Sequence, residues 1–125
     1  MIKLVILLKK RADMSHDDFR RYYEDHHSKL NLEIPYVRRY FRRYLTPIAT
    51  PSSEGVGATN FDVMAELWFD NRQDIDRAMA FVAETDLAVA LRQDEENLFD
   101  RKKSTFYLVE EFETDRATGA NFRVP

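Results

Sequence analysis

The sequence predicts an α+β domain in which helices cover one face of a single antiparallel sheet. Two segments, residues 2–9 and 61–69, have the alternation and the β-branched or aromatic content of strands. An amphipathic helix is predicted between them at residues 15–30, and a second helical region followed by a strand completes the chain. If residues 35–45 also form a strand, the order is β-α-β-β-α-β, the ferredoxin-like arrangement.

The first strand and the first helix have clear signals. Residues 2–9 carry apolar side chains on both faces, which is typical of a central strand. Ser15 is a good N-cap for the helix that follows, and Met14 and Phe19 are placed to form a hydrophobic staple. At about 100° per residue, one side of this helix carries Phe19, Tyr22, Tyr23, His26, His27 and Leu30.

The same helix holds all three histidines of the chain. Its geometry places His26 deeper in the apolar side, which favours a structural role, and His27 at the margin near Tyr23. There a partly desolvated imidazole can act as a general acid or base, or it can bind the free carbonyl groups at the helix end. We expect no metal, because adjacent histidines point about 100° apart and the His-Glu-x-x-His pattern is absent.

Residues 35–45 (PYVRRYFRRYL) are compatible with two structures. Their spacing slightly favours a helix, whereas their aromatic content and the flanking prolines suit a strand. A strand would place Tyr36, Tyr40 and Tyr44 on one face, where they pack or orient an aromatic ligand. The four arginines are either cross-strand partners or groups that hold a carboxylate or phenolate substrate. Residues 46–60 are expected to form a long loop.

The strand predicted at residues 61–69 carries acidic groups on one of its faces. For Glu66 two interpretations stay open: a cavity carboxylate that works with His27, or an ion-pair partner of the neighbouring arginines. For Asp62 a structural role is favoured, either in a solvent-facing polar stripe or in an ion pair with the arginines of residues 35–45. The same face holds Asp62, Met64, Glu66 and Trp68.

The rest of the chain predicts two helices and one strand. Asp70 or Asn71 caps the first of these helices, and the second begins near Asp86. Residues 104–113 then read as a final strand, and residues 114–125 as a polar, irregular tail.

Composition limits the classes of function. A chain of 125 residues suits a single domain, 1–125, with its core at about 2–113. The net charge of −3 gives little support for nucleic-acid binding, and the lack of cysteine excludes disulfides and thiolate chemistry. The apolar run at residues 4–8 is too short for a membrane span or a secretory signal. We therefore expect a soluble cytoplasmic protein with no membrane or nucleic-acid partner.

Several segments together resemble the EthD-domain family of the dimeric α+β barrel superfamily. They are LLKKRADMSHDDF, the helix with Phe19, Tyr22-Tyr23 and His27, and the stretches PYVRRYFRRYL, FDVMAELWFDN and LFDRKKSTFYLVEEF. Two positions depart from the family pattern, because Tyr23 stands where a tryptophan is usual and His-Ser-Lys-Leu replaces His-Ala-Pro-Leu. The resemblance implies that residues 35–45 form a strand. It also implies a homodimer in which two open sheet faces meet and close a barrel around a cavity.

The resemblance further implies a small-molecule enzyme. His27, at the cavity of the barrel, would transfer a proton on an apolar or aromatic carbonyl compound, in a decarboxylation, a dehydration or a cofactor-free oxidation. Substrate-binding residues would be Tyr23, Tyr40, Glu66 and Trp68, with no metal and no cofactor. The alternative is a non-catalytic carrier or accessory protein that binds such compounds.

Overall fold

The computed structural model describes residues 1–53 and 60–125, which form one α+β unit around a four-stranded antiparallel sheet. The strand order is β2-β3-β1-β4, and all three strand pairs are antiparallel. This is the ferredoxin-like topology that the sequence predicts. The strands are β1 (Ile2–Leu8), β2 (Arg39–Tyr44), β3 (Val63–Phe69) and β4 (Thr105–Leu108).

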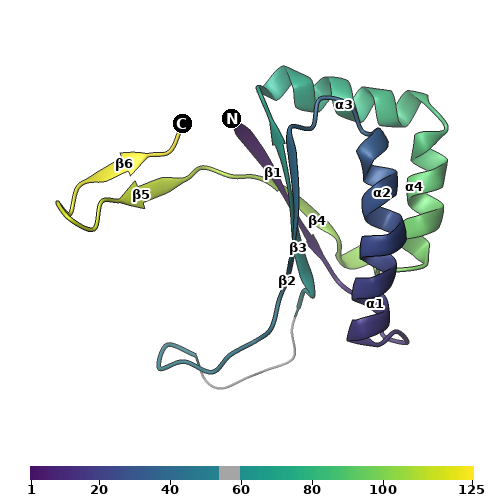
Figure 1. The fold of residues 1–125 in the computed structure, drawn as a ribbon, viewed down its shortest axis with the longest axis horizontal. Coiled ribbons are helices and arrows are strands. Elements are labelled where there is room, and N and C mark those ends of the chain that lie inside the picture. Colours follow the sequence, from purple (N-terminus) through teal and green to yellow (C-terminus); the bar gives the residue numbers. More distant parts are fainter. Residues whose placement is uncertain (54–59) are drawn as a thin grey trace.

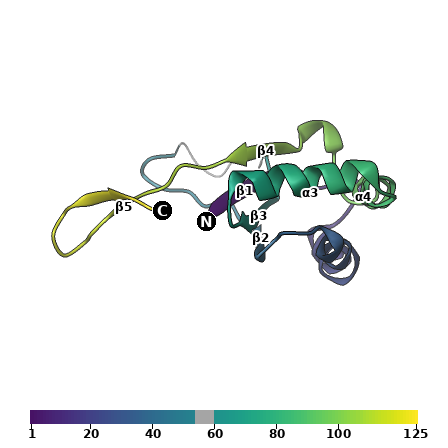
Figure 2. The same ribbon diagram turned by 90° about the horizontal axis from the view of Figure 1, so that it is seen from above.

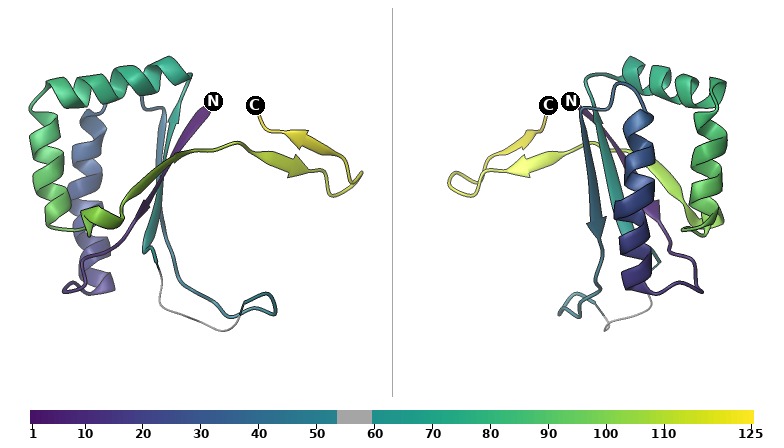
Figure 3. Two further views of the ribbon diagram at one scale, coloured as in Figure 1. Left: turned by 180° about the vertical axis from the view of Figure 1, so that it is seen from behind. Right: turned by 45° about the vertical axis from the view of Figure 1, so that its right-hand side comes forward.

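The helices all lie on one side of the sheet (Figure 1). The first helical segment and α4 run side by side against the sheet, and α3 crosses one end of the layer (Figure 3). In chain order the helices are α1 (His16–Tyr22), the π-helix η1 (Tyr23–His27), α2 (Ser28–Leu30), the short 3-10 helix η2 (Asn31–Glu33), α3 (Arg72–Glu84), α4 (Leu87–Glu96) and the 3-10 helix η3 (Arg101–Lys103).

The helix starts follow the capping signals of the sequence. The Ser15 hydroxyl accepts a hydrogen bond from the backbone N–H of Asp18 at 3.1 Å. At the start of α3 it is Asn71, not Asp70, that caps, because its side-chain oxygen accepts from the N–H of Asp74 at 2.9 Å. Each cap satisfies a backbone donor that has no partner within the helix.

The first helix contains one wide turn that the sequence does not reveal. The N–H of Ser28 donates to the carbonyl of Tyr23, five residues earlier, so η1 is a π-turn within an otherwise α-helical segment. The extra residue in this turn rotates the following side chains by about 100° relative to an unbroken α-helix. As a result His27 is buried and His26 is exposed, which reverses the predicted depths of the two imidazoles.

The two faces of the sheet differ in whether helices pack against them. The helix-facing side is the core, with Leu4, Leu8, Val63, Ala65, Leu67 and Phe69 all buried. The other side, here called the open face, has no helix over it (Figure 2). By strand register it presents Val5, Leu7, Met64, Glu66 and Trp68.

The second strand is shorter than the predicted segment 35–45. Tyr40 and Tyr44 pair with Leu67 and Val63 and so share the helix-facing side. Tyr36 lies in a turn before the strand, with a φ of 69°, and it does not extend the row of tyrosines. Within the predicted loop 46–60, the described part 46–53 has no helix or strand, and residues 54–59 lie outside the described residues.

The C-terminal region is more regular than the sequence predicts. Instead of one strand at residues 104–113 and an irregular tail, β4 ends at Leu108 and a hairpin follows, formed by β5 (Phe112–Thr114) and β6 (Asn121–Arg123). Gly119 closes the hairpin with a φ of 76°, a conformation that glycine adopts without strain. The hairpin projects from the body on the side of the sheet away from the helices (Figures 1 and 2).

Candidate functional site

A cavity of about 170 Å³ lies between the helices and the helix-facing side of the sheet. Its walls are mainly aliphatic and aromatic, with a few polar groups among them, which is the usual character of a small-molecule site. The lining residues are Leu4, Ile6, Leu8, Tyr23, His27, Asn31, Ile34, Tyr40, Leu67, Met79, Val82, Leu91, Glu95, Phe99, Ser104 and Phe106. We refer to this cavity as the His27 pocket.

The position of the pocket corrects one expectation. The resemblance implies that the histidine lies beside a hollow that forms only when the open faces of two protomers meet. In the structure the His27 pocket is formed by a single protomer, on the opposite side of the sheet. The reason is that α1–α2 and α4 pack over the sheet with a space between them and it, and the aromatic side chains fill that space only in part.

His27 is held by Asp94, a residue of α4. Its Nδ1 lies 2.8 Å from Oδ2 of Asp94, and the side chain of His27 is 6% exposed. Because an ionised carboxylate only accepts hydrogen bonds, this contact places the imidazole proton on Nδ1. Among the described residues no hydrogen bond occupies Nε2, so that nitrogen is available to a ligand.

Asp94 is fixed in turn by the neighbouring helix. The hydroxyl of Tyr22 donates to Oδ1 of Asp94 at 2.5 Å, and Asn97 donates to the same hydroxyl at 3.2 Å. Burial and the contact with Asp94 raise the pKa of Tyr22, so the phenol remains a donor. Asp94 therefore binds two groups of the first helix, and it fixes the direction of the His27 ring.

Two aromatic rings fix the imidazole from its other sides. Tyr23 and Phe99 both meet the His27 ring edge to face, with centroid distances of 5.1 and 5.4 Å. Such contacts are favourable and hold ring orientation in an apolar environment. The imidazole is therefore positioned in two independent ways, by a charged hydrogen bond and by aromatic packing.

Tyr23 and Tyr40 meet at the same pocket. Their hydroxyl groups are 2.8 Å apart and share a hydrogen bond. Burial raises the pKa of Tyr40 to about 12 and holds that of Tyr23 well above its ordinary value. Both phenols are thus neutral over the physiological range, and both can orient a polar group of a ligand.

A charged cluster stands behind the tyrosine pair. Arg42 donates two hydrogen bonds to Glu24, at 2.6 and 2.9 Å, and the Tyr44 hydroxyl donates to the same carboxylate at 2.6 Å. The hydrogen bond from Arg42 lowers the pKa of Glu24, against a smaller opposing effect of burial. The guanidinium also lies 4.8 Å from the centre of the Tyr40 ring. The cluster therefore links the first helix to β2 and supports the wall of the pocket.

Glu66 and Trp68 lie away from this site. Both project from the open face of β3, whereas Tyr23, Tyr40 and His27 lie on the helix-facing side. Trp68 donates from its indole nitrogen to Glu66 at 3.0 Å, and Arg43 forms an ion pair with the same carboxylate. The structure therefore separates the predicted site residues into two groups. The ion pair with Arg43 was one of the two interpretations for Glu66.

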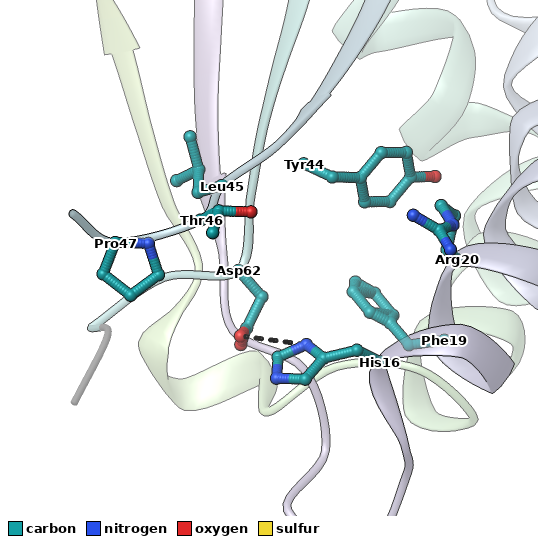
Figure 4. Close-up of a pocket in the computed structure, with 8 residues that line it drawn as sticks. All are labelled: His16, Phe19, Arg20, Tyr44, Leu45, Thr46, Pro47 and Asp62. Atoms are coloured by element: carbon teal, nitrogen blue, oxygen red, sulfur yellow. Dashed lines mark ion pairs between the residues drawn. The ribbon is translucent and has the colours of Figure 1, made fainter.

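A second hollow, of about 270 Å³, opens near the start of α1 (Figure 4). Asp62 and His16 face each other across it with a distance of 3.9 Å, and Phe19 and Tyr44 form one wall. The Asp62 carboxylate also accepts from the backbone N–H of Lys10 at 2.8 Å. Asp62 is buried, so the solvent-facing alternative is wrong, and Nζ of Lys9, just after β1, lies 3.6 Å from its Oδ2. The ion-pair interpretation thus holds in type, with a lysine as the partner that the structure shows.

Sequence reasoning missed Asp94, which holds His27, and Glu95, which belongs to the pocket lining. Both lie on α4, and a row of acidic residues at a helix end usually faces solvent. The sequence gives only a partial indication that these two residues face inward. Leu91 and Leu98 mark the buried side of this segment, and Asp94 and Glu95 lie between them in sequence. That Asp94 faces His27 depends on how two helices dock.

Among the residues that the structure describes, no group of three or more histidine, aspartate or glutamate side chains is arranged to hold a metal ion. No helix in the described part of the chain is both long and apolar enough to cross a bilayer.

Comparisons with known proteins identify a family. Residues 11–102 match the EthD domain family. No curated protein is similar enough in sequence to count as a relative.

Solved structures show the same fold at low sequence identity. An EthD family protein of Bacillus halodurans superposes with a TM-score of 0.60 at 23% identity, over 89% of this chain and 99% of that one. HapK of Hahella chejuensis has a TM-score of 0.59 at 15% identity, with 95% and 100% covered. A ferredoxin-like protein of Thermobifida fusca, described as dimeric and of unknown function, has a TM-score of 0.55 at 14% identity, with 86% and 88% covered.

Proposed function

Because the chain belongs to the EthD family, we propose that it is a small-molecule enzyme in which His27 transfers a proton on an apolar or aromatic carbonyl compound. The reaction is a decarboxylation, a dehydration or a cofactor-free oxidation. The observation that carries this proposal is the hydrogen bond from Nδ1 of His27 to Asp94 at the wall of an apolar pocket. A carboxylate, an imidazole and a space beside its second nitrogen form the usual arrangement of a general base.

The chemistry follows from the two ring nitrogens. With its proton on Nδ1, the ring offers the Nε2 lone pair to an acidic C–H or O–H next to the carbonyl group of the substrate. The imidazolium that forms is stabilised by Asp94, and it returns the proton from Nε2 to the same or another atom of the substrate. Tyr23 and Tyr40 supply neutral hydroxyl groups that can bind the carbonyl oxygen as negative charge develops on it.

Exchange of carbon-bound hydrogen tests this role without knowledge of the natural substrate. Acetophenone, a single-ring methyl ketone, is incubated with the protein in D₂O, and loss of the methyl proton signal is followed by NMR. A general base typically contributes about 10²–10⁴-fold in rate, so His27→Gln should reduce the protein-dependent exchange to near the background rate.

His26→Gln is the matched control, since His26 is the adjacent imidazole and is exposed. This variant should exchange at the wild-type rate. Equal exchange by the wild type and His27→Gln would refute the general-base role.

The second candidate function is a carrier that binds such compounds without chemical change. The same apolar lining that suits a substrate also suits a ligand that is only shielded from water. A carrier binds acetophenone in a thermal-shift or NMR titration, and its affinity changes little in His27→Gln. Binding without protein-dependent exchange would favour the carrier over the enzyme.

A homodimer is part of the proposal. Among the described residues no helix covers the open face, which presents Val5, Leu7 and Trp68 beside the charged Lys3, Glu66 and Arg43. A sheet face without cover is a site of association or aggregation unless it is paired. The Thermobifida fusca protein with this fold is described as dimeric. We therefore expect two copies of this chain to associate through their open faces, with one His27 pocket in each.

A further inference from the structure

On the basis of the proposed function, we infer that the His27 pocket takes an uncharged, single-ring compound and that Glu95 sets this selectivity by repelling anions. Glu95 belongs to the pocket lining and lies directly after Asp94 on α4. The inference concerns which molecules enter the pocket, and it is independent of the step that His27 performs on them.

The size of the pocket limits the ligand to about one ring. A dry, apolar cavity of about 150 Å³ holds a benzene molecule, and the His27 pocket measures about 170 Å³. Sites for drug-sized compounds span about 300–1,000 Å³. A ring with one small substituent therefore fits within the pocket, whereas a fused polycyclic compound would extend beyond it.

The charge of the lining excludes carboxylates. Among the described residues that line the pocket there is no lysine and no arginine. A carboxylate that leaves water loses its hydration, and a cation compensates this loss more strongly than the neutral hydroxyl groups of Tyr23 and Tyr40. Instead, the acidic residue Glu95 belongs to the lining, and the carboxylate of Asp94 holds the imidazole.

The partner of Glu95 neutralises it only in part. Nε of Arg101 lies 3.4 Å from Oε2 of Glu95, and the two side chains are 45% and 31% exposed. Ion pairs of this exposed kind are weak. Arg101 itself is not among the lining residues.

This selectivity narrows the proposed reactions. A decarboxylase must bind the carboxylate that it removes, and the pocket provides no cation for it. Proton transfer or loss of water from a neutral ketone, aldehyde or alcohol needs no such group. A preference for neutral ligands thus favours dehydration over decarboxylation among the proposed reactions.

Benzamide and benzoate test the inference, because they share a ring and a planar substituent of the same size and differ in charge. Dissociation constants are measured by NMR titration in the wild type and in His27→Gln, which removes any charge on the imidazole from the comparison. We expect benzamide to bind at least about tenfold more tightly than benzoate, as a like charge at close range in a partly wet site predicts. Glu95→Gln should reduce this ratio to about threefold or less.

Two further variants complete the test. Glu96→Gln, which changes an exposed neighbour outside the pocket, should leave the ratio unchanged. Arg101→Gln removes the partial neutralisation of Glu95 and should increase the ratio, which keeps the inference testable even if Glu95→Gln folds poorly.

Three results would overturn the inference: benzoate binding as tightly as benzamide, no binding of benzamide at its solubility limit, or a ratio unchanged by both Glu95→Gln and Arg101→Gln. None of these measurements depends on turnover. If His27→Gln keeps the wild-type exchange of acetophenone, the general-base proposal fails, while the preference for benzamide would still stand.

Discussion

Asp94 Oδ2 accepts a hydrogen bond from Nδ1 of His27 at 2.8 Å and thereby joins the first helix to the fourth. The same carboxylate accepts from Tyr22 at 2.5 Å. Two donors on successive turns of one helix thus converge on a single acceptor of another helix. This contact both aligns the helices and fixes which imidazole nitrogen faces the pocket.

Replacing Asp94 by Asn should impair catalysis more than folding. The amide can keep the packing, but it can also donate to Nδ1 and so select the other tautomer, with the proton on Nε2. We expect acetophenone exchange to fall roughly tenfold to a hundredfold, within the range that a general base contributes.

Tyr22→Phe is the control for this variant. It removes the second hydrogen bond to Asp94 and leaves the one to His27 in place. Exchange should fall by less than in Asp94→Asn. A larger loss in Tyr22→Phe than in Asp94→Asn would contradict the proposed orientation of the ring.

The hydroxyl pair of Tyr23 and Tyr40 should show strong energetic coupling. Tyr40→Phe leaves the buried Tyr23 hydroxyl without its partner at 2.8 Å, and an unsatisfied buried polar group costs about 1–3 kcal/mol. The double variant removes both hydroxyls and should be less destabilised than the two single variants summed. Urea unfolding of the four proteins measures this, and simple additivity would argue against the hydrogen bond.

Alkaline conditions should reveal the tyrosine pKa shifts. A tyrosine whose pKa is higher in the folded than in the unfolded protein stabilises the fold fully below the unfolded value of about 10, and this contribution is lost as the pH rises through the folded value. For Tyr40 the folded value is about 12. The free energy of unfolding should therefore fall between about pH 10 and pH 12, and less steeply in Tyr40→Phe. An equal slope in both proteins would contradict the raised pKa.

Acid should weaken the cluster around Glu24. Its pKa is lowered in the folded protein, chiefly by the hydrogen bond from Arg42, so its contribution to stability is present above the unfolded pKa and is lost as the pH falls through the folded value. Glu24→Gln should therefore destabilise the protein at pH 7 and destabilise it less as the pH falls below the ordinary glutamate pKa. Asp17→Asn, which alters an exposed pair with Arg20, is the control and should have little effect throughout this pH range.

A new charge at the centre of the open face should prevent two protomers from associating. Val5→Lys places an ammonium group at the centre of this face, where Glu66 of the neighbouring strand can pair with it in a single protomer. We expect a folded monomer, detected as a halved mass by light scattering. Val89→Lys, at an exposed position on α4, should keep the wild-type mass. A dimeric Val5→Lys variant would exclude the open face as the interface.

The parts of the fold that depend on local sequence were predictable. The alternation at β3 and the cap at Ser15 each follow from a few neighbouring residues, and the structure contains both. The turn at Gly119 was missed, although the polar stretch DRATG between apolar residues carries a recognisable signal for a hairpin.

The site was predictable only in part. Its central residue, His27, was identified, but its burial depends on the π-turn, and no side-chain pattern indicates where an extra residue enters a helix. Its partner Asp94 is 67 positions away, and helix docking decides which acidic residue of α4 meets it. Strand register explains why Glu66 and Trp68 do not join the site, because side chains two apart share a face and theirs is the open one.

The wide turn at Tyr23–His27 has a consequence for how the chain can be shortened. Asp25 is exposed within this turn. The turn contains one residue more than a regular α-helical turn, and Asp25 can be regarded as that residue. Without Asp25 the backbone could close into regular α-helical spacing, and His27 would then occupy the inward position that an unbroken helix offers to its predecessor. Excision of this one aspartate is therefore compatible with the imidazole still facing Asp94, whereas removal of a residue downstream of His27 would leave the turn intact and displace Leu30 instead.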